Sequence, residues 1–473
     1  MKLASIITTA ALAGLSLTQA LAAPTIFSRG HTDVGIAFEG GAFDLHVHAE
    51  EFGLEAEPGA AVLRVLPTAE NLIPSNPAFS FLGISGNPVW ILPQDSDEAE
   101  TAGILYLGIG SEEIAPGTFS GDLSMALTNV AFTPEPGSSP SAPSADFSVY
   151  TVNSGGVPTV LMSTHDGIDS ADTATITPGG HTHVNWAFTQ PGRYVVSFAV
   201  TGTPTGGSAV TDSASYTFVV KSSDSATDTQ VQAGEPIAVG AGAALITSLS
   251  PVAVAPDRSG LFFSTLKKFG ANTALIDATN DRALLRVSNY LPAIIAREGD
   301  ALVGLPGTKI KSFTDANASA DGTIIVNASL LTGAGGILPT NDVALSVVTP
   351  GGLSPAIREG DAAPGLSGYN FISFASYLPA DNGQVIGVGT VRNTTLNLSK
   401  TVVFRATPGV SPEILAATGE LLLTDAGTLT VKSISRPTGM NLPLGHTGGC
   451  VQILINFTDR SSQLVRFFAP PQS

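Results

Sequence analysis

Residues 30–50 read GHTDVGIAFEGGAFDLHVHAE, two alternating runs joined by the pair Gly40-Gly41. A Gly-Gly pair between such runs predicts a two-residue β-hairpin turn, because glycine tolerates the positive φ that these turns need. The antiparallel register that follows places Asp33 opposite His48. Alternate residues of a strand share a face, so this stretch predicts a hairpin with one apolar and one polar face.

The same period of two recurs along most of the chain, in short runs broken by Gly, Pro, Asn and Asp. The sequence has 51 glycines, 32 prolines and only 13% charged residues, which is typical of strands and tight turns. Residues 147–152, 194–200 and 216–220 are rich in the β-branched and aromatic side chains that strands favour. We therefore expect an all-β protein in which residues 23–220 form a β-sandwich with a flexible Pro/Ser-rich loop at 133–145.

The second half of the chain repeats itself. Arg297-Glu-Gly-Asp300 recurs as Arg358-Glu-Gly-Asp361, and weaker echoes stand at residues 233–236 and 418–420. A fixed period of about sixty residues with short strands in each unit is typical of propeller blades or a related all-β array. The sequence predicts a propeller-like array of about four β-repeat units over residues 233–473, after a polar linker at 221–232.

The first 22 residues have the features of a cleavable signal peptide: Lys2, an apolar run from Leu3 to Leu17, and the small-x-small motif Ala20-Leu-Ala22. No later stretch approaches the length of a transmembrane helix. The sequence thus predicts a protein that is secreted or held at the cell surface or envelope. Its net charge of −18, with only 21 Lys and Arg, excludes the basic surface that nucleic acid binding needs.

Six strings in the first half resemble, in order, the choice-of-anchor M domain of bacterial surface-anchored proteins. They are Gly30-His-Thr-Asp-Val-Gly35, Leu45-His-Val-His-Ala-Glu50, Phe81-Leu-Gly83, Val89-Trp-Ile-Leu-Pro-Gln94, Leu105-Tyr-Leu-Gly-Ile-Gly110 with Glu112-Glu113, and Gly180-His-Thr-His-Val-Asn-Trp-Ala-Phe188. In actinobacterial members this domain is associated with cell-wall attachment and with metal-type ABC transporter neighbourhoods. The resemblance implies a surface role near metal uptake, with cell-surface or envelope components as partners. The repeats at 233–468 resemble bacterial exported proteins named for an N-x-x-G-x-x-A-F repeat.

Six of the seven histidines lie in the first half, and four of them form two His-x-His pairs, so each pair presents two imidazoles on one face of a strand. The hairpin register brings His31 and Asp33 beside His46 and His48, with His31 opposite Glu50. Neutral imidazoles on adjacent strands are good ligands for a divalent transition metal, for which zinc is the natural choice. The candidate metal ligands are His31, Asp33, His46, His48, His181 and His183. The alternatives are solvated histidines, histidines hydrogen-bonded to nearby carboxylates, or two separate sites.

No G-x-S-x-G elbow, phosphate-binding loop or zinc-protease helix motif is present, and Gly108-Ile-Gly110 stops short of a dinucleotide fingerprint. The expected function is therefore a non-enzymatic, exported bacterial surface or envelope protein with a metal-binding β-domain and a repeat domain for interaction. One alternative is an adhesin or glycan-binding module without metal, in which the histidines are incidental. We expect Trp90 and Trp186 in the core, although an exposed aromatic could stack on a sugar. Another alternative is a metal-dependent hydrolase with Glu50 as general base.

Overall fold

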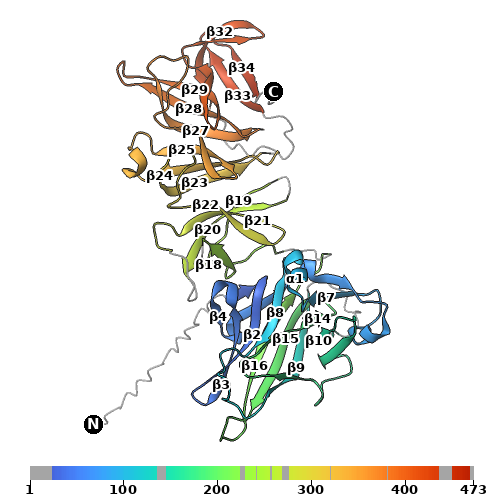
Figure 1. Ribbon diagram of the computed structural model, residues 1–473. Helices are drawn as coiled ribbons and strands as arrows, with labels where there is room; N and C mark the ends of the chain where they lie inside the picture. Colours follow the sequence, from blue (N-terminus) through green and yellow to red (C-terminus); the bar gives the residue numbers. More distant parts are fainter. Residues whose placement is uncertain are drawn as a thin grey trace, which may run out of the picture.

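The computed structural model describes residues 24–135, 145–223, 229–240, 242–255, 258–268, 276–319, 321–380, 382–435 and 450–468. The predicted signal peptide, most of the 133–145 loop, the middle of the 221–232 linker and His446 lie outside these residues. The described chain is all-β, as predicted, with a sandwich followed by four stacked repeat sheets (Figure 1). Within the described residues, no helix combines the length and the apolarity needed to cross a membrane.

Three sheets build the sandwich, and their strands follow in spatial order. The six-stranded sheet contains β1 (Thr25–Phe27), β5 (Ala61–Val65), β16 (Val210–Val220), β15 (Gly192–Gly202), β9 (Leu123–Pro134) and β12 (Thr173–Ile176). One five-stranded sheet contains β11 (Pro158–Ser163), β10 (Phe147–Val152), β14 (Asn185–Phe188), β7 (Pro88–Leu92) and β6 (Glu70–Leu72). The other, called the histidine sheet below, contains β13 (His181–His183), β8 (Leu105–Gly110), β2 (Gly30–Glu39), β3 (Ala42–Ala49) and β4 (Leu54–Ala56).

The helices are short and lie between strands. They are α1 (Ser96–Ala102) and the 3-10 turns η1 (Glu50–Phe52), η2 (Pro58–Ala60), η3 (Pro67–Ala69), η4 (Pro77–Leu82) and η5 (Ala334–Gly336). Asp95 caps the N-terminus of α1, since its carboxylate accepts hydrogen bonds from the N–H groups of Asp97 and Glu98. Gly103 caps the C-terminus in the left-handed conformation.

The sandwich core is aromatic and lies between the six-stranded sheet and the other two. The Trp186 ring packs 6.0 Å from Phe198, and Phe188 lies 5.1 Å from Phe218, so β14 lies over β15 and β16. The indole N–H of Trp186 donates to the carbonyl of Leu107, which ties this core to β8. Because Trp186 and Trp90 are 0% and 2% exposed, both tryptophans are core residues and neither presents a ring to a sugar.

The hairpin β2–β3 has the predicted register, with Phe38 opposite Phe43, Gly35 opposite His46 and Asp33 opposite His48. The apolar side chains of β3 are buried in the sandwich core, which fixes the polar residues on the opposite face.

The array consists of four sheets, and each takes its strands from one stretch of sequence. The first contains β17 (Pro236–Val239), β18 (Gly242–Ile246), β19 (Ser250–Val254), β20 (Gly260–Lys268), β21 (Arg282–Ser288) and β22 (Leu291–Arg297). The second contains β23 (Ile310–Ala318), β24 (Ile324–Leu330), β25 (Val343–Thr349) and β26 (Gly352–Arg358); the third, β27 (Asn370–Ala380), β28 (Gln384–Asn393), β29 (Leu398–Thr407) and β30 (Val410–Ala417). The fourth contains β31 (Leu421–Thr424), β32 (Gly427–Ile434), β33 (Cys450–Phe457) and β34 (Ser462–Phe468).

The repeated glycines occupy equivalent positions, at turns that lead into each sheet. The N–H groups of Gly234, Gly299, Gly360 and Gly419 donate to the carbonyls of Ile246, Ile310, Phe371 and Val431, respectively, each at 2.8 Å. In the two full copies of the motif the aspartate also accepts a hydrogen bond from the backbone of the arginine, Arg297 N–H to Asp300 and Arg358 N–H to Asp361. The predicted period is confirmed, and the motif is a structural turn. The sheets form an open stack, with the first and the last at opposite ends (Figure 1).

A buried ion pair joins the sandwich to the array. Arg64 of β5 and Glu235, which follows the first repeated glycine, are 3% and 1% exposed and contact each other directly. The N–H of Ile26 also donates to the carbonyl of Gly234 at 3.0 Å. Within the predicted linker, the N–H of Lys221 donates to the carbonyl of Val65 and the carbonyl of Thr229 accepts from Arg64. Independent folding of the two halves stays a prediction.

Candidate metal centre

The histidine sheet places residues that are distant in sequence next to each other across its strands, because β8 lies parallel to β2 and antiparallel to β13. One row across the strands runs through His183, Gly108, Asp33 and His48, and the next runs through His181, Gly110, Gly35 and His46. The interior positions of these rows are therefore Asp33 or glycine, while the histidines come from the flanking strands.

The first cluster consists of His31, Asp33, His181 and His183, whose potential ligand atoms all lie within 4.8 Å of one another. Nε2 of His31 and Nε2 of His181 are 3.2 Å apart, and Nε2 of His181 is 3.1 Å from Oδ1 of Asp33. Two ligands of a tetrahedral zinc ion, each about 2.0–2.1 Å from the metal, are roughly 3.3–3.4 Å apart. The spacing of the two imidazoles is thus close to that of two ligands of one ion.

Two glutamates hold the outer nitrogens of this cluster. Oε2 of Glu50 lies 2.9 Å from Nδ1 of His31, and Oε1 of Glu112 lies 3.1 Å from Nδ1 of His181. A carboxylate on Nδ1 favours the tautomer whose Nε2 carries a lone pair and orients the ring, as in the carboxylate–histidine–metal arrangement of zinc proteins. Both Nε2 atoms are therefore directed toward the same point beside Asp33.

Burial sets the electrostatics of the first cluster. Asp33 is 1% exposed, and burial raises the pKa of its carboxyl, opposed by the nearby His181 and His31. Burial, reinforced by His181 and His31, lowers the pKa of His183 to about 3, so this imidazole is neutral at physiological pH. Oδ2 of Asp33 is buried and makes no hydrogen bond, with Nε2 of His31 at 3.5 Å. Buried polar atoms are seldom left unpaired, and a cation bound beside Asp33 would compensate its carboxylate.

Glycines make the space that these side chains occupy. A Cβ atom on Gly108 would overlap Oδ1 of Asp33 and would lie 2.9 Å from Nε2 of His181 and 3.1 Å from Cε1 of His183. The side chains of both flanking strands lean over Gly108, and the ring of His183 also stacks on Tyr106 with a centroid distance of 3.4 Å. The cluster requires a residue without a side chain at this position.

The second cluster consists of His46, His48 and Glu113, again with all potential ligand atoms within 4.8 Å. Its imidazoles come from the second strand of the hairpin, and Oε1 of Glu113 lies 3.3 Å from Nε2 of His46. His46 leans over Gly35, where a Cβ would overlap its ring. The six predicted ligands thus share one face but divide into two groups, because His31 and Asp33 face β13 across β8 while His46 and His48 remain with β3.

Sequence reasoning gave no role to Glu112 and Glu113, although both belong to a string quoted above. They follow β8 directly, and the position of β8 between β2 and β13 is a long-range pairing that the local pattern does not predict. The remaining histidine of the described residues, His165, lies apart and contacts Asp146 at 3.0 Å.

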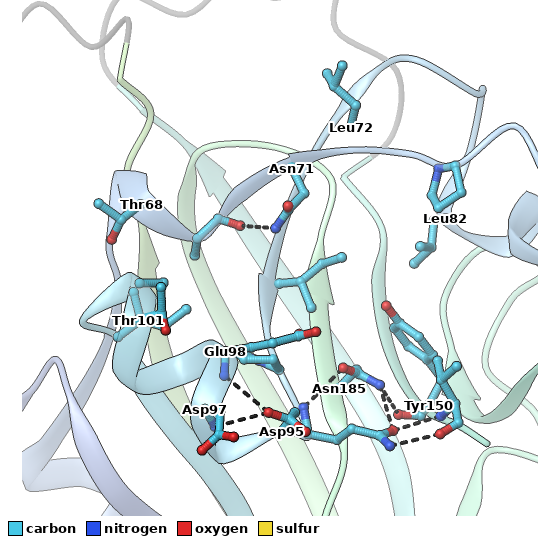
Figure 2. A pocket seen from close by; sticks show the side chains of 18 of the residues that line it. Thr68, Asn71, Leu72, Leu82, Asp95, Asp97, Glu98, Thr101, Tyr150 and Asn185 are labelled. Atoms are coloured by element: carbon cyan, nitrogen blue, oxygen red, sulfur yellow. Dashed lines mark hydrogen bonds between the residues drawn. The ribbon is translucent and has the colours of Figure 1, made fainter. Parts of the chain in front are cut away.

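A hollow of about 870 Å³ lies away from the two clusters, between α1, β7 and η4 of the sandwich (Figure 2). The side chains of Asn71, Gln94, Asp95 and Asn185 in its lining make hydrogen bonds to one another or to the backbone. Oδ1 of Asn185 accepts from the N–H of Gln94, the side chain of Gln94 both donates to and accepts from the backbone of Val152, and Asp95 caps α1. These groups hold α1 against the sheet, so the hollow offers less unsatisfied chemistry than the two clusters.

Comparison with known proteins gives a family without a described activity. Residues 124–449 match a family described as "Family of unknown function (DUF7453)". The chain belongs to the DUF7453 family. The DUF7453 match includes His181 and His183 but begins after β2 and β3. It therefore covers two of the six candidate ligands. No curated protein and no solved structure matches the chain.

Proposed function

We propose that this protein is an exported, non-enzymatic bacterial surface or envelope protein that holds a divalent metal on the histidine sheet, with zinc as the expected ion. The observation that carries the proposal is the convergence of two Nε2 atoms and a buried carboxylate, with a glutamate on each outer nitrogen. Histidines that bind a metal almost always have such a partner on the nitrogen that does not face the metal.

The stacked array supports the second part of the proposal, an interaction role with surface or envelope components. A series of similar sheets presents a long side surface, as in other repeat proteins that bind partners. The resemblance to choice-of-anchor M and N-x-x-G-x-x-A-F repeat proteins suggests the same location. N-terminal sequencing of the exported protein should give a first residue near position 23. A protein that stays inside the cell with residues 1–22 still attached would refute the export proposal.

Metal analysis tests the binding proposal. The purified protein, stripped with a chelator, should bind zinc in calorimetry, and the double variant His31→Ala/His181→Ala should lose the binding assigned to the first cluster. His165→Ala is the matched control, since it removes an imidazole of the same domain outside both clusters, and it should bind as the wild type does. A wild-type protein that shows no response to zinc, copper, nickel or manganese would refute metal binding and favour a glycan-binding module.

The non-enzymatic part has its own test. The zinc-loaded protein should show no metal-dependent turnover of aryl ester or aryl glycoside substrates. Turnover that requires the metal and is lost in Glu50→Gln would instead establish a hydrolase.

A further inference from the structure

We propose that the second cluster is a second metal site and that the carboxylate of Asp33 bridges the two, so that a loaded chain holds a pair of ions. This inference rests on the proposed metal-binding function and extends it from one ion to two.

The second cluster has a buried nitrogen with no hydrogen bond. His46 is 6% exposed, and its Nε2 has no hydrogen-bond partner although Oε1 of Glu113 lies 3.3 Å away. This nitrogen is thus available as a ligand atom, and Glu113 offers a carboxylate oxygen on the same side. Together with His48 this makes two nitrogens and one oxygen, a donor set that zinc and manganese both accept.

A small hollow joins the two clusters. It has a volume of about 60 Å³ and is lined by Asp33, Gly35, Ile36, His46, His48, Gly110, Glu112 and Glu113. One water molecule occupies about 30 Å³ of liquid volume, so the hollow has room for an ion with a bound water. The hollow therefore adjoins the second cluster, and Asp33 is the member of the first cluster that also lines it. Gly35 and Gly110 place no side chain in this space.

Asp33 has the position that a bridging carboxylate requires. It lies opposite His48 in the β2–β3 register, and its Oδ1 is within 3.1 Å of His181 in the first cluster. Its Oδ2 is buried without a hydrogen bond, lies 3.5 Å from Nε2 of His31, and is on the side of Gly110, which lines the hollow. In two-metal sites the ions are about 3.5–4 Å apart, which one carboxylate spans through its two oxygens.

The charges around the hollow also favour two cations. Asp33, Glu112 and Glu113 line it with carboxylates, and Glu50 lies on the far side of His31. Among the described residues, no lysine or arginine lines this space. One divalent ion would leave excess negative charge in a partly buried site, whereas two ions balance it.

Stoichiometry is the first test. Chelated protein reloaded with zinc and measured by native mass spectrometry should hold two ions per chain, and His165→Ala should also hold two. The variants His46→Ala/His48→Ala and His181→Ala/His183→Ala should each hold one. Zero ions in the wild type would refute the proposed function itself, whereas one ion in the wild type, or two in the His46→Ala/His48→Ala variant, would refute only the second site.

Magnetic coupling is the second test, and it does not depend on a variant that must fold. Wild-type protein loaded with two manganese ions should show an exchange-coupled electron paramagnetic resonance spectrum, because a shared carboxylate couples the spins. Asp33→Asn should lower the affinity of both sites by about tenfold or more and remove the coupling. Two bound ions with uncoupled spectra in the wild type would overturn the bridge.

Discussion

In the histidine sheet glycines lie inside strands, whereas in the array the repeated glycines lie between strands. Gly108 and Gly35 leave room for imidazole and carboxylate side chains that lean across from neighbouring strands. Gly299 and Gly360 instead adopt φ values of 87° and 85° in turns that lead from one sheet to the next. The same residue type therefore makes room for ligand side chains in one region and forms a repeated backbone turn in the other.

The largest expected effect concerns the connection between the two regions. Arg64→Met leaves Glu235 buried without its partner, and loss of one member of a buried ion pair costs about 3–5 kcal/mol. Burial already raises the pKa of Glu235, because desolvation outweighs its attraction to Arg64. Urea unfolding of Arg64→Met should show a free energy of unfolding that is lower by this amount. The double variant Arg64→Met/Glu235→Met should recover much of it, and an unchanged midpoint in the single variant would contradict this role.

The second prediction tests the space over a strand glycine. Gly108→Ala should weaken zinc binding at the first cluster about a hundredfold, or about 2.7 kcal/mol, because its Cβ overlaps Asp33 and crowds His181. Gly121→Ala is the control, since no atom lies within 4 Å of its added Cβ. Calorimetric titration measures both. Equal affinities in the two variants would show that the cluster does not need the space over Gly108.

The third prediction tests a glycine of the array. Gly360→Ala places a side chain at positive φ, which costs about 1–2 kcal/mol, and its Cβ would lie 3.1 Å from Cβ of Asn341. Thermal unfolding should occur at lower temperature while metal stoichiometry stays unchanged. Gly351→Ala, whose added Cβ meets only Val303 at 3.8 Å, should have a much smaller effect. Loss of bound metal in Gly360→Ala would contradict the separation of the two roles.

The smallest effect is a pH dependence in the array. Burial, with Asp342 adding to it, raises the pKa of Glu359 from 4.5 to about 7. The folded state then binds more protons than the unfolded state between these values, so this residue makes stability fall as pH rises from about 4.5 to 7. Glu359→Gln should flatten that part of the profile in urea unfolding between pH 4 and 8. The exposed Glu100→Gln should leave it as in the wild type; an identical slope in Glu359→Gln would contradict the assignment.

Local sequence patterns predicted the fold well. The alternation and the Gly40-Gly41 turn determine the β2–β3 register, and the repeated Arg-Glu-Gly-Asp motif marks the sheets of the array, because both depend on neighbours in sequence. Two separate sites were one of the alternatives from the sequence, but the grouping of His31 and Asp33 with His181 and His183 could not be predicted from it. That grouping depends on the insertion of β8 beside β2, which is decided by core packing across the sandwich and brings Glu112 to His181.

The ends of the array are far apart because its sheets are connected in series. The extensive contacts between sheets are between consecutive ones, each entered through an equivalent glycine turn, and the stack leads away from the sandwich (Figure 1). The number of units in such a stack sets the distance between its two ends. Insertion or loss of one unit of about sixty residues would change the reach between the histidine sheet and the distal sheet by one step, without altering either end.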